Sequence, residues 1–231
     1  MFQKWFPLKC ISFGLIFLGT FSWAAPVKKP TVSIKGKETQ LPALLREVEA
    51  KYTQSQTLSA DFTQIVDDLA LSRKKTSFGK IYVKRPSKIR WEFTKPIVNL
   101  LVSDGNTFWY YTPPFDEGER GQVMVKKASE VKSKLANALL AGSFSFQQDG
   151  VFEQKGPSTF VLTPKKGTAG TVKQATIEIN PETKLIQKVT LAHRGGNLTA
   201  ITLSQVRLGV SLADDLFVFK APPNTDVMEP Q

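Results

Sequence analysis

FGKIYVKRPSKIRWEFTKPIVNLLVSDGNTFWYYTPP, residues 78–114, is the stretch that decides the fold. Aromatic, β-branched and polar residues alternate through several short runs, which Lys84-Arg85-Pro86 and Asp104-Gly105 separate. Such alternation is typical of antiparallel strands that turn one face to an apolar interior. Within about thirty positions the stretch carries these aromatic residues: Tyr82, Trp91, Phe93, Phe108, Trp109, Tyr110 and Tyr111. We therefore expect a sheet with a concave aromatic face.

Strand-like runs continue on both sides of this stretch. Leu58, Ala60 and Phe62 alternate with polar residues, and later runs cover 122–125, 160–163, 174–179, 186–193, 198–208 and 216–219. Turns that contain Gly, Pro or Asn separate the later runs. No linker or change of composition divides the series. We predict a mainly β fold in a single domain, with one highly curved antiparallel sheet of about ten or eleven strands.

Two segments have helical periodicity instead. Pro42 suits the first turn of the first segment, whose apolar residues fall on one stripe: Leu41, Leu44, Leu45, Val48 and Tyr52. Residues 129–142 predict a second helix, which ends at Gly142 and has Val131, Leu135 and Leu139 on one face. We expect an amino-terminal helix and an inserted helix to cover one side of the sheet.

The amino terminus is typical of an export signal. Lys4 and Lys9 form a basic region, residues 10–21 form an apolar core, and Ser22-Trp23-Ala24 is a small-residue cleavage site. The apolar core is shorter than the roughly twenty residues of a spanning helix. We predict a signal peptide at 1–24, a flexible basic leader at 25–38 and one domain at 39–231. Cleavage would remove Cys10, the only cysteine, and no cysteine stands where lipid anchoring requires one.

The chain is strongly basic. Its formal net charge is +11, and the predicted signal peptide contributes two lysines and no acid to it. Lysine pairs are scattered along the chain, as at 74–75, 126–127 and 165–166, and export argues against nucleic acid as a partner. We interpret the charge as a solvated surface, with attraction to an anionic membrane or an acidic partner as the alternative.

The inventory of catalytic residues is thin. His193 is the only histidine, and it lies near the end of a strand-like run without a nucleophile motif nearby. No cluster of His, Cys or carboxylates has metal-ligand spacing, and the glycine-rich segments lack a phosphate-loop context. We predict that the protein is not an enzyme and uses no metal or cofactor. An apolar container remains, and aromatic residues that fill the core of a closed sandwich are the alternative. Rings on both faces of the strand at 108–111 and two helices that could cover one opening favour the container.

Several motifs in order resemble one known family. The motifs are Ser59-Ala60-Asp61-Phe62-Thr63-Gln64, Val83-Lys84-Arg85-Pro86, Arg90-Trp91, Thr94-Lys95-Pro96, Leu101-Val102-Ser103-Asp104-Gly105, Phe108-Trp109-Tyr110-Tyr111 and Phe160-Val161-Leu162-Thr163-Pro164. With the closing Phe217-Val218-Phe219 and Pro222-Pro223, the resemblance covers about residues 40 to 227. Together they resemble the periplasmic outer-membrane lipoprotein carrier, the LolA family.

The resemblance implies an incomplete, half-open antiparallel β-barrel that helical lids cover. In this family an apolar cavity receives the acyl chains of lipoproteins that an inner-membrane ABC transporter releases. The carrier, expected here as a periplasmic monomer, delivers them to an outer-membrane lipoprotein receptor. The missing lipid-anchor cysteine favours the soluble carrier over that anchored relative.

The resemblance also implies site residues. Arg85 aligns with an arginine that bonds lid-helix carbonyls in the closed state, a role that suits the five donors of a guanidinium. We therefore predict Arg85 as a latch of the closed, empty state. Strand and helix spacing then predicts the residues that line the acyl-chain cavity: Phe62, Ile89, Trp91, Phe93, Leu101, Val131, Leu135 and Leu139.

Two alternatives stay open at this point. A periplasmic sensor or binding module of related fold would use the cavity for another lipid or for a peptide. A periplasmic hydrolase is disfavoured by the catalytic inventory, and turnover that depends on His193 would revive it.

Overall fold

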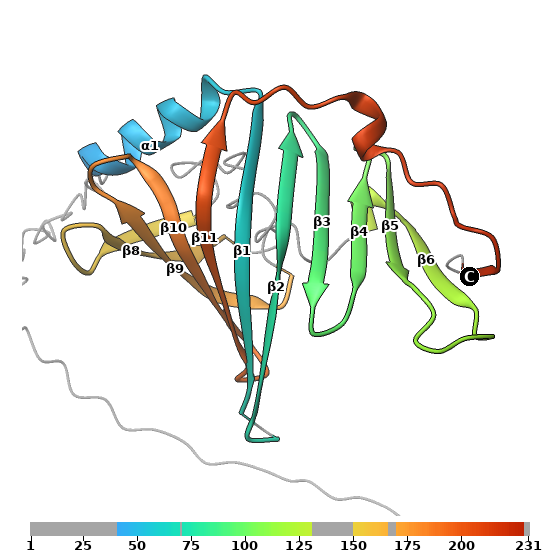
Figure 1. Ribbon diagram of the computed structural model, residues 1–231. Coiled ribbons are helices and arrows are strands. Elements are labelled where there is room, and N and C mark those ends of the chain that lie inside the picture. The colour runs from blue at the N-terminus through green and yellow to red at the C-terminus, as the bar shows by residue number, and fades with distance from the viewer. Residues whose placement is uncertain (1–40, 70, 131–149, 166–169, 229–231) are drawn as a thin grey trace, which may run out of the picture. The chain divides into compact units, whose positions relative to one another are not determined.

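The structure is a computed structural model that describes residues 41–69, 71–130, 150–165 and 170–228. Within these residues, twelve strands form one curved sheet in the order β12-β6-β5-β4-β3-β2-β1-β11-β10-β9-β8-β7 (Figure 1). The strands are β1 (Thr57–Asp68), β2 (Arg73–Lys84), β3 (Lys88–Lys95), β4 (Asn99–Ser103), β5 (Thr107–Thr112), β6 (Gly121–Lys127), β7 (Gly150–Gln154), β8 (Thr159–Pro164), β9 (Val172–Asn180), β10 (Leu185–His193), β11 (Leu198–Leu208) and β12 (Thr225–Met228). The outermost strands β7 and β12 do not pair with each other, so the sheet is an incomplete barrel.

The predicted fold class is confirmed, with three corrections. The sheet has twelve strands rather than ten or eleven. It is mixed rather than fully antiparallel, because β12 pairs in parallel with β6 while every other neighbouring pair is antiparallel. The strand predicted at 216–219 is wrong, because Asp214–Phe217 forms the short 3-10 helix η2.

The first helix, α1 (Ala43–Thr53), packs on one face of the sheet. Leu45, Val48 and Tyr52 are its buried residues, at the spacing that places them on one side of a helix. They belong to the same core cluster as Leu58, Phe62 and Ile81 of the strands. Two contacts tie α1 to the turn between β9 and β10: Lys51 donates to the Thr183 carbonyl at 2.7 Å, and Glu47 pairs with Lys184 at 3.2 Å. We call the sheet face under α1 the inner face.

The carboxy-terminal segment runs over β3 to β6 on the other side of these strands (Figure 1). Arg90 donates to the Leu216 carbonyl at 3.2 Å, and the Phe219 ring lies 5.5 Å from Tyr111 and 6.3 Å from Trp109. Asp214 accepts from Lys88 at 2.6 Å and contacts Lys84 at 3.1 Å, and these two lysines lower the pKa of its carboxyl. These contacts hold the segment against the outer face.

Several predictions fall outside the described residues. They are the signal peptide, the basic leader, most of the inserted helix and the cavity residues Val131, Leu135 and Leu139. The described part of that segment ends with a short 3-10 helix, η1 (Ala128–Glu130). In the described ranges, no helix has both the length and the apolar character needed to cross a membrane.

Candidate functional site: an aromatic face of the sheet

Three aromatic rings meet on the inner face. The ring centroid of Phe62 on β1 lies 5.0 Å from that of Trp91 and 5.1 Å from that of Phe93, and the two β3 rings are 6.0 Å apart. The Phe62–Phe93 pair is edge-to-face, a geometry that adds about 0.5–1.5 kcal/mol to the effect of burial alone. Sequence spacing predicted these three residues on one face, and the structure brings them together. We call them the aromatic cluster.

Gly79 on β2 makes the contact between Phe62 and Phe93 possible. The register pairs Phe62 with Gly79 and Gly79 with Phe93, so the glycine lies between the two rings. A Cβ at Gly79 would collide with the Glu92 carbonyl and would lie 2.9 Å from the Phe62 ring. Because β2 has no side chain here, two rings from strands on either side of it close over the gap. The sequence analysis missed this role.

Ile89 and Leu101 extend the cluster on the same face. Leu101 of β4 lies opposite Trp91 and is partly buried against the core, and Ile89 is 6% exposed. Because cross-strand neighbours share a face, the described members of the predicted cavity lining form one continuous apolar surface. The rings at the centre are covered: Phe62 is 2% exposed and Trp91 is 5% exposed. The centre of the aromatic cluster is therefore shielded from solvent in the structure.

The indole N–H of Trp91 is a polar group inside this apolar surface. Its Nε1 is buried and has no hydrogen-bond partner among the described residues. Leaving a buried donor unpaired costs about 1–3 kcal/mol, so such groups are rare in folded proteins. The cluster thus offers one donor to an acceptor from a ligand, a water molecule or another part of the chain.

Arg85 lies in the turn between β2 and β3 and connects it to the end of α1. Its backbone N–H donates to the Gln56 carbonyl at 2.8 Å, and its Nη1 donates to the carbonyls of Tyr52 and Ser55. The last carbonyls of a helix have no partner within the helix and carry partial negative charge, so a guanidinium is a suitable donor to them. The contact made by Arg85 is thus with the carboxyl end of α1.

Tyr52 is part of the same connection. Its ring is 1% exposed, and its hydroxyl accepts from the Ile186 N–H of β10 at 3.1 Å. Burial raises the pKa of Tyr52 to about 12, although the Ile186 hydrogen bond and the Arg85 charge act in the opposite direction. Burial also lowers the pKa of Arg85, and Tyr52 opposes that shift. Tyr52 fell on the predicted helical stripe, but its polar contacts were not predicted.

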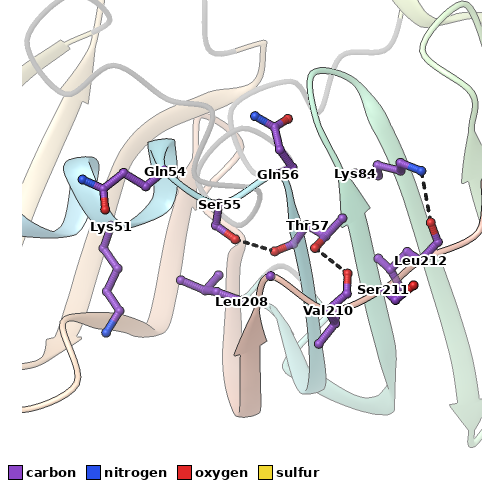
Figure 2. A pocket seen from close by; sticks show the side chains of 11 residues that line it. Lys51, Gln54, Ser55, Gln56, Thr57, Lys84, Leu208, Val210, Ser211 and Leu212 are labelled. Atoms are coloured by element: carbon purple, nitrogen blue, oxygen red, sulfur yellow. Dashed lines mark hydrogen bonds between the residues drawn. The ribbon is translucent and has the colours of Figure 1, made fainter.

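An open pocket of about 630 Å³ lies beside this connection, between the end of α1 and the chain after β11 (Figure 2). Internal hydrogen bonds occupy much of its polar lining. Thr57 Oγ1 donates to the Val210 carbonyl at 2.6 Å, Ser55 Oγ to the Thr57 carbonyl at 2.9 Å, and Lys84 Nζ to the Leu212 carbonyl at 3.1 Å. Among the described residues predicted to line the acyl-chain cavity, none lines this pocket. We interpret it as a groove between elements that these bonds fasten together.

The aromatic run 108–111 divides between the two faces, as its alternation predicted. Tyr110 pairs with Leu101 across β4 and β5, so it lies on the inner face with the cluster. Trp109 and Tyr111 lie on the outer face and contact Phe219. Only half of this aromatic run is therefore available to the inner face.

His193 has a structural environment in this fold. It ends β10, and its two ring nitrogens lie 3.1 Å from Thr171 Oγ1 and 3.2 Å from Thr199 Oγ1. Burial lowers the pKa of the imidazole. Within the described ranges, no three His, Cys, Asp or Glu side chains gather into a group that could hold a metal ion.

A curved, open β sheet with an aromatic inner face is a scaffold suited to an apolar ligand. The family described as outer membrane lipoprotein carrier protein LolA matches residues 53–220. The chain belongs to this family.

Its relatives carry the same description. An outer-membrane lipoprotein carrier protein of Methylococcus capsulatus is 30% identical over 179 residues, which cover 76% of this chain and 82% of that protein. A second one, from Vibrio parahaemolyticus, is 31% identical over 183 residues, covering 78% and 83%. Among solved structures, a LolA superfamily protein from Nitrosomonas europaea has a TM-score of 0.44 at 11% identity, covering 76% of this chain and 96% of that one.

Proposed function

We propose that this chain is a periplasmic carrier, and not an enzyme, that binds the acyl chains of lipoproteins on its inner face. It accepts them when an inner-membrane ABC transporter releases them, and it delivers them to an outer-membrane receptor. Membership of the lipoprotein carrier family supports the cargo. The export signal predicted at 1–24 supports the compartment.

The observation that carries the proposal is the aromatic cluster on the inner face. Phe62, Trp91 and Phe93 form an apolar surface that continues through Leu101. The carbonyl that links an acyl chain to its lipoprotein is an acceptor, and the buried N–H of Trp91 is a donor without a partner in the described residues. An acyl chain on this surface would bury methylenes and could also satisfy the indole.

Acyl binding requires the inner face to open. Phe62 and Trp91 are almost completely covered, and they share one core cluster with Leu45 and Val48 of α1. An acyl chain of roughly fourteen methylenes gains about 11 kcal/mol if it is fully buried, at about 0.8 kcal/mol per methylene. Separation of α1 from the sheet offsets part of this gain. The offset keeps the affinity low enough for cargo to leave.

Arg85 is positioned to set the size of that offset. Its Nη1 bonds join the β2–β3 turn to the carbonyls of Tyr52 and Ser55 at the end of α1. These bonds exist only while α1 lies on the sheet, so they favour the closed, empty state. We therefore propose Arg85 as the latch, with Phe62, Ile89, Trp91, Phe93 and Leu101 as the described part of the acyl-chain cavity.

The test is a release assay. Inner-membrane vesicles that bear a labelled lipoprotein and an ABC transporter are incubated with ATP and the purified exported protein. We expect label to leave the vesicles as a soluble one-to-one complex. A transporter that releases its lipoprotein to its own carrier, but not to this protein in folded form, would overturn the proposal and point to another ligand.

A matched variant ties release to the cavity. Phe93→Glu places a charge in the aromatic cluster, whereas Phe78→Glu places the same charge on an exposed neighbour of the same hairpin. We expect release to fall only with Phe93→Glu. Equal release by the two variants would remove the aromatic cluster from the proposal.

A further inference from the structure

A second pocket continues from the aromatic cluster toward the tip of the β1–β2 hairpin. It has a volume of about 490 Å³ and takes its walls from β1, β2, β3, β4 and β5. Phe93 belongs both to this pocket and to the cluster, and Tyr110 is a second aromatic wall. The pocket therefore lies at one end of the apolar surface, where polar and charged residues begin. We call it the hairpin pocket.

The strand register explains which side chains reach it. Phe62, Gly79, Phe93 and Asn99 form one cross-strand row on the inner face. Two further rows toward the hairpin tip pair Val66 with Lys75 and Asp68 with Arg73. Since side chains two residues apart on a strand share a face, Lys75 and Arg73 lie on the inner face as well. The apolar surface thus gives way to basic residues over a few positions.

The charges of the hairpin pocket are not balanced. Within the described residues, neither Arg73 nor Lys75 forms an ion pair, whereas Lys74 pairs with Asp67 at 3.3 Å. Asp68 is the one carboxylate in the lining, and its Oδ1 already accepts from the Leu71 N–H at 3.2 Å. The lining thus holds three cations and one carboxylate, and two of these cations, Arg73 and Lys75, have no ion pair in the described residues, which favours an anionic group in the pocket.

Asn99 supplies an independent sign of a polar ligand. Its Oδ1 is buried and has no hydrogen-bond partner among the described residues. A hydroxyl group can donate to this oxygen and can also accept from the amide nitrogen. A ligand with an anion and a hydroxyl would thus suit the cations and the amide together.

We propose that the hairpin pocket binds the phosphate-bearing head of an anionic acyl lipid whose chain lies on the aromatic cluster. Arg73 and Lys75 donate to the phosphate, and Asn99 bonds a hydroxyl of the head. Only one part of this inference, the binding of the acyl chain on the aromatic cluster, rests on the proposed function. Lipoprotein cargo and such a lipid would compete for the same inner face.

The test compares two lipids with one chain. The exported protein is titrated calorimetrically, below the critical micelle concentration, with myristoyl lysophosphatidylglycerol and with zwitterionic myristoyl lysophosphatidylcholine. Two exposed charge pairs to the phosphate predict roughly tenfold tighter binding of the anionic lipid, which corresponds to about 1.4 kcal/mol. The pocket variant is Arg73→Gln with Lys75→Gln. The control is Lys80→Gln with Lys173→Gln, which removes the same charge at exposed positions outside the pocket.

The proposal expects the preference to vanish in the pocket variant and to persist in the control. Equal binding of the two lipids by the native protein, or an equal loss of preference in both variants, would overturn it. Inorganic phosphate that binds as tightly as the anionic lipid would assign the pocket to the free anion instead. If the native protein shows no head-group preference but still releases lipoprotein from the vesicles, the pocket proposal is wrong and the proposed function is unaffected. Failed release by the native protein would remove that function whatever the lipids do.

Discussion

Arg85 shows how much of a single residue's role could be predicted from the sequence. The motif Val83-Lys84-Arg85-Pro86 and the donor geometry of a guanidinium predicted bonds to helix carbonyls. The partners were not predictable from local sequence, because Tyr52 and Ser55 lie 33 and 30 residues away. Only the packing of α1 on the sheet brings its last carbonyls to this turn.

Replacing Arg85 tests the latch. Arg85→Leu removes both Nη1 bonds and leaves the carbonyls of Tyr52 and Ser55 without this donor. We expect the free energy of unfolding to fall by about 1–3 kcal/mol, as measured by urea unfolding. We also expect slower transfer of labelled lipoprotein to outer-membrane vesicles. Without the Arg85 bonds, the closed, empty state is less stable and competes less with the open, loaded state.

Arg46→Leu is the matched control for this prediction, because Arg46 lies exposed on α1. It should transfer cargo at the native rate. Transfer by Arg85→Leu at the native rate would contradict the latch.

His193 gives the chain a defined pH dependence. Burial lowers its pKa in the folded state, so the unfolded chain takes up a proton at higher pH than the folded chain does. The stability contribution is fully present above about pH 6.5 and is lost as pH falls through the lower folded pKa. His193→Gln should therefore lose less stability between pH 7 and pH 5 in urea unfolding. An unchanged slope would contradict this assignment, since the chain has no other histidine.

At the scale of elements, alternation predicted strands well where both neighbours in the sheet are antiparallel. The prediction at 198–208 coincides with β11 (Leu198–Leu208), and 174–179 lies within β9. The prediction at 216–219 failed, because a short apolar run such as Leu216, Phe217, Val218 and Phe219 also suits a segment that lies across a sheet. The parallel pairing of β12 with β6 was not predictable, since it joins segments about a hundred residues apart.

Within the sheet, position 79 is where the packing of the strands most clearly requires a glycine. Gly79→Ala forces the Glu92 carbonyl of β3 and the Phe62 ring to move. Such overpacking costs about 1–3 kcal/mol, so we expect that loss in the free energy of unfolding. Gly195→Ala, where a Cβ would meet nothing within 4 Å, should cost much less. Equal costs at the two positions would show that β3 accommodates the methyl group.

At the scale of the whole described fold, Phe62, Trp91 and Phe93 lie together on one face of the sheet, as their spacing predicted, because a period of two is fixed by strand geometry. Their role as cavity lining, like the latch role of Arg85, stays a proposal. The order of the rings was not predictable, because it depends on the register across Gly79.

The most direct test of the central claim maps where cargo lies. A lipoprotein with a photoreactive diazirine in its acyl chain is loaded onto the protein, irradiated and analysed by mass spectrometry of the digested complex. We predict adducts on inner-face residues, above all Phe62, Trp91, Phe93 and Leu101. Adducts on Trp109, Tyr111 or Phe219 of the outer face, with none on the aromatic cluster, would contradict it.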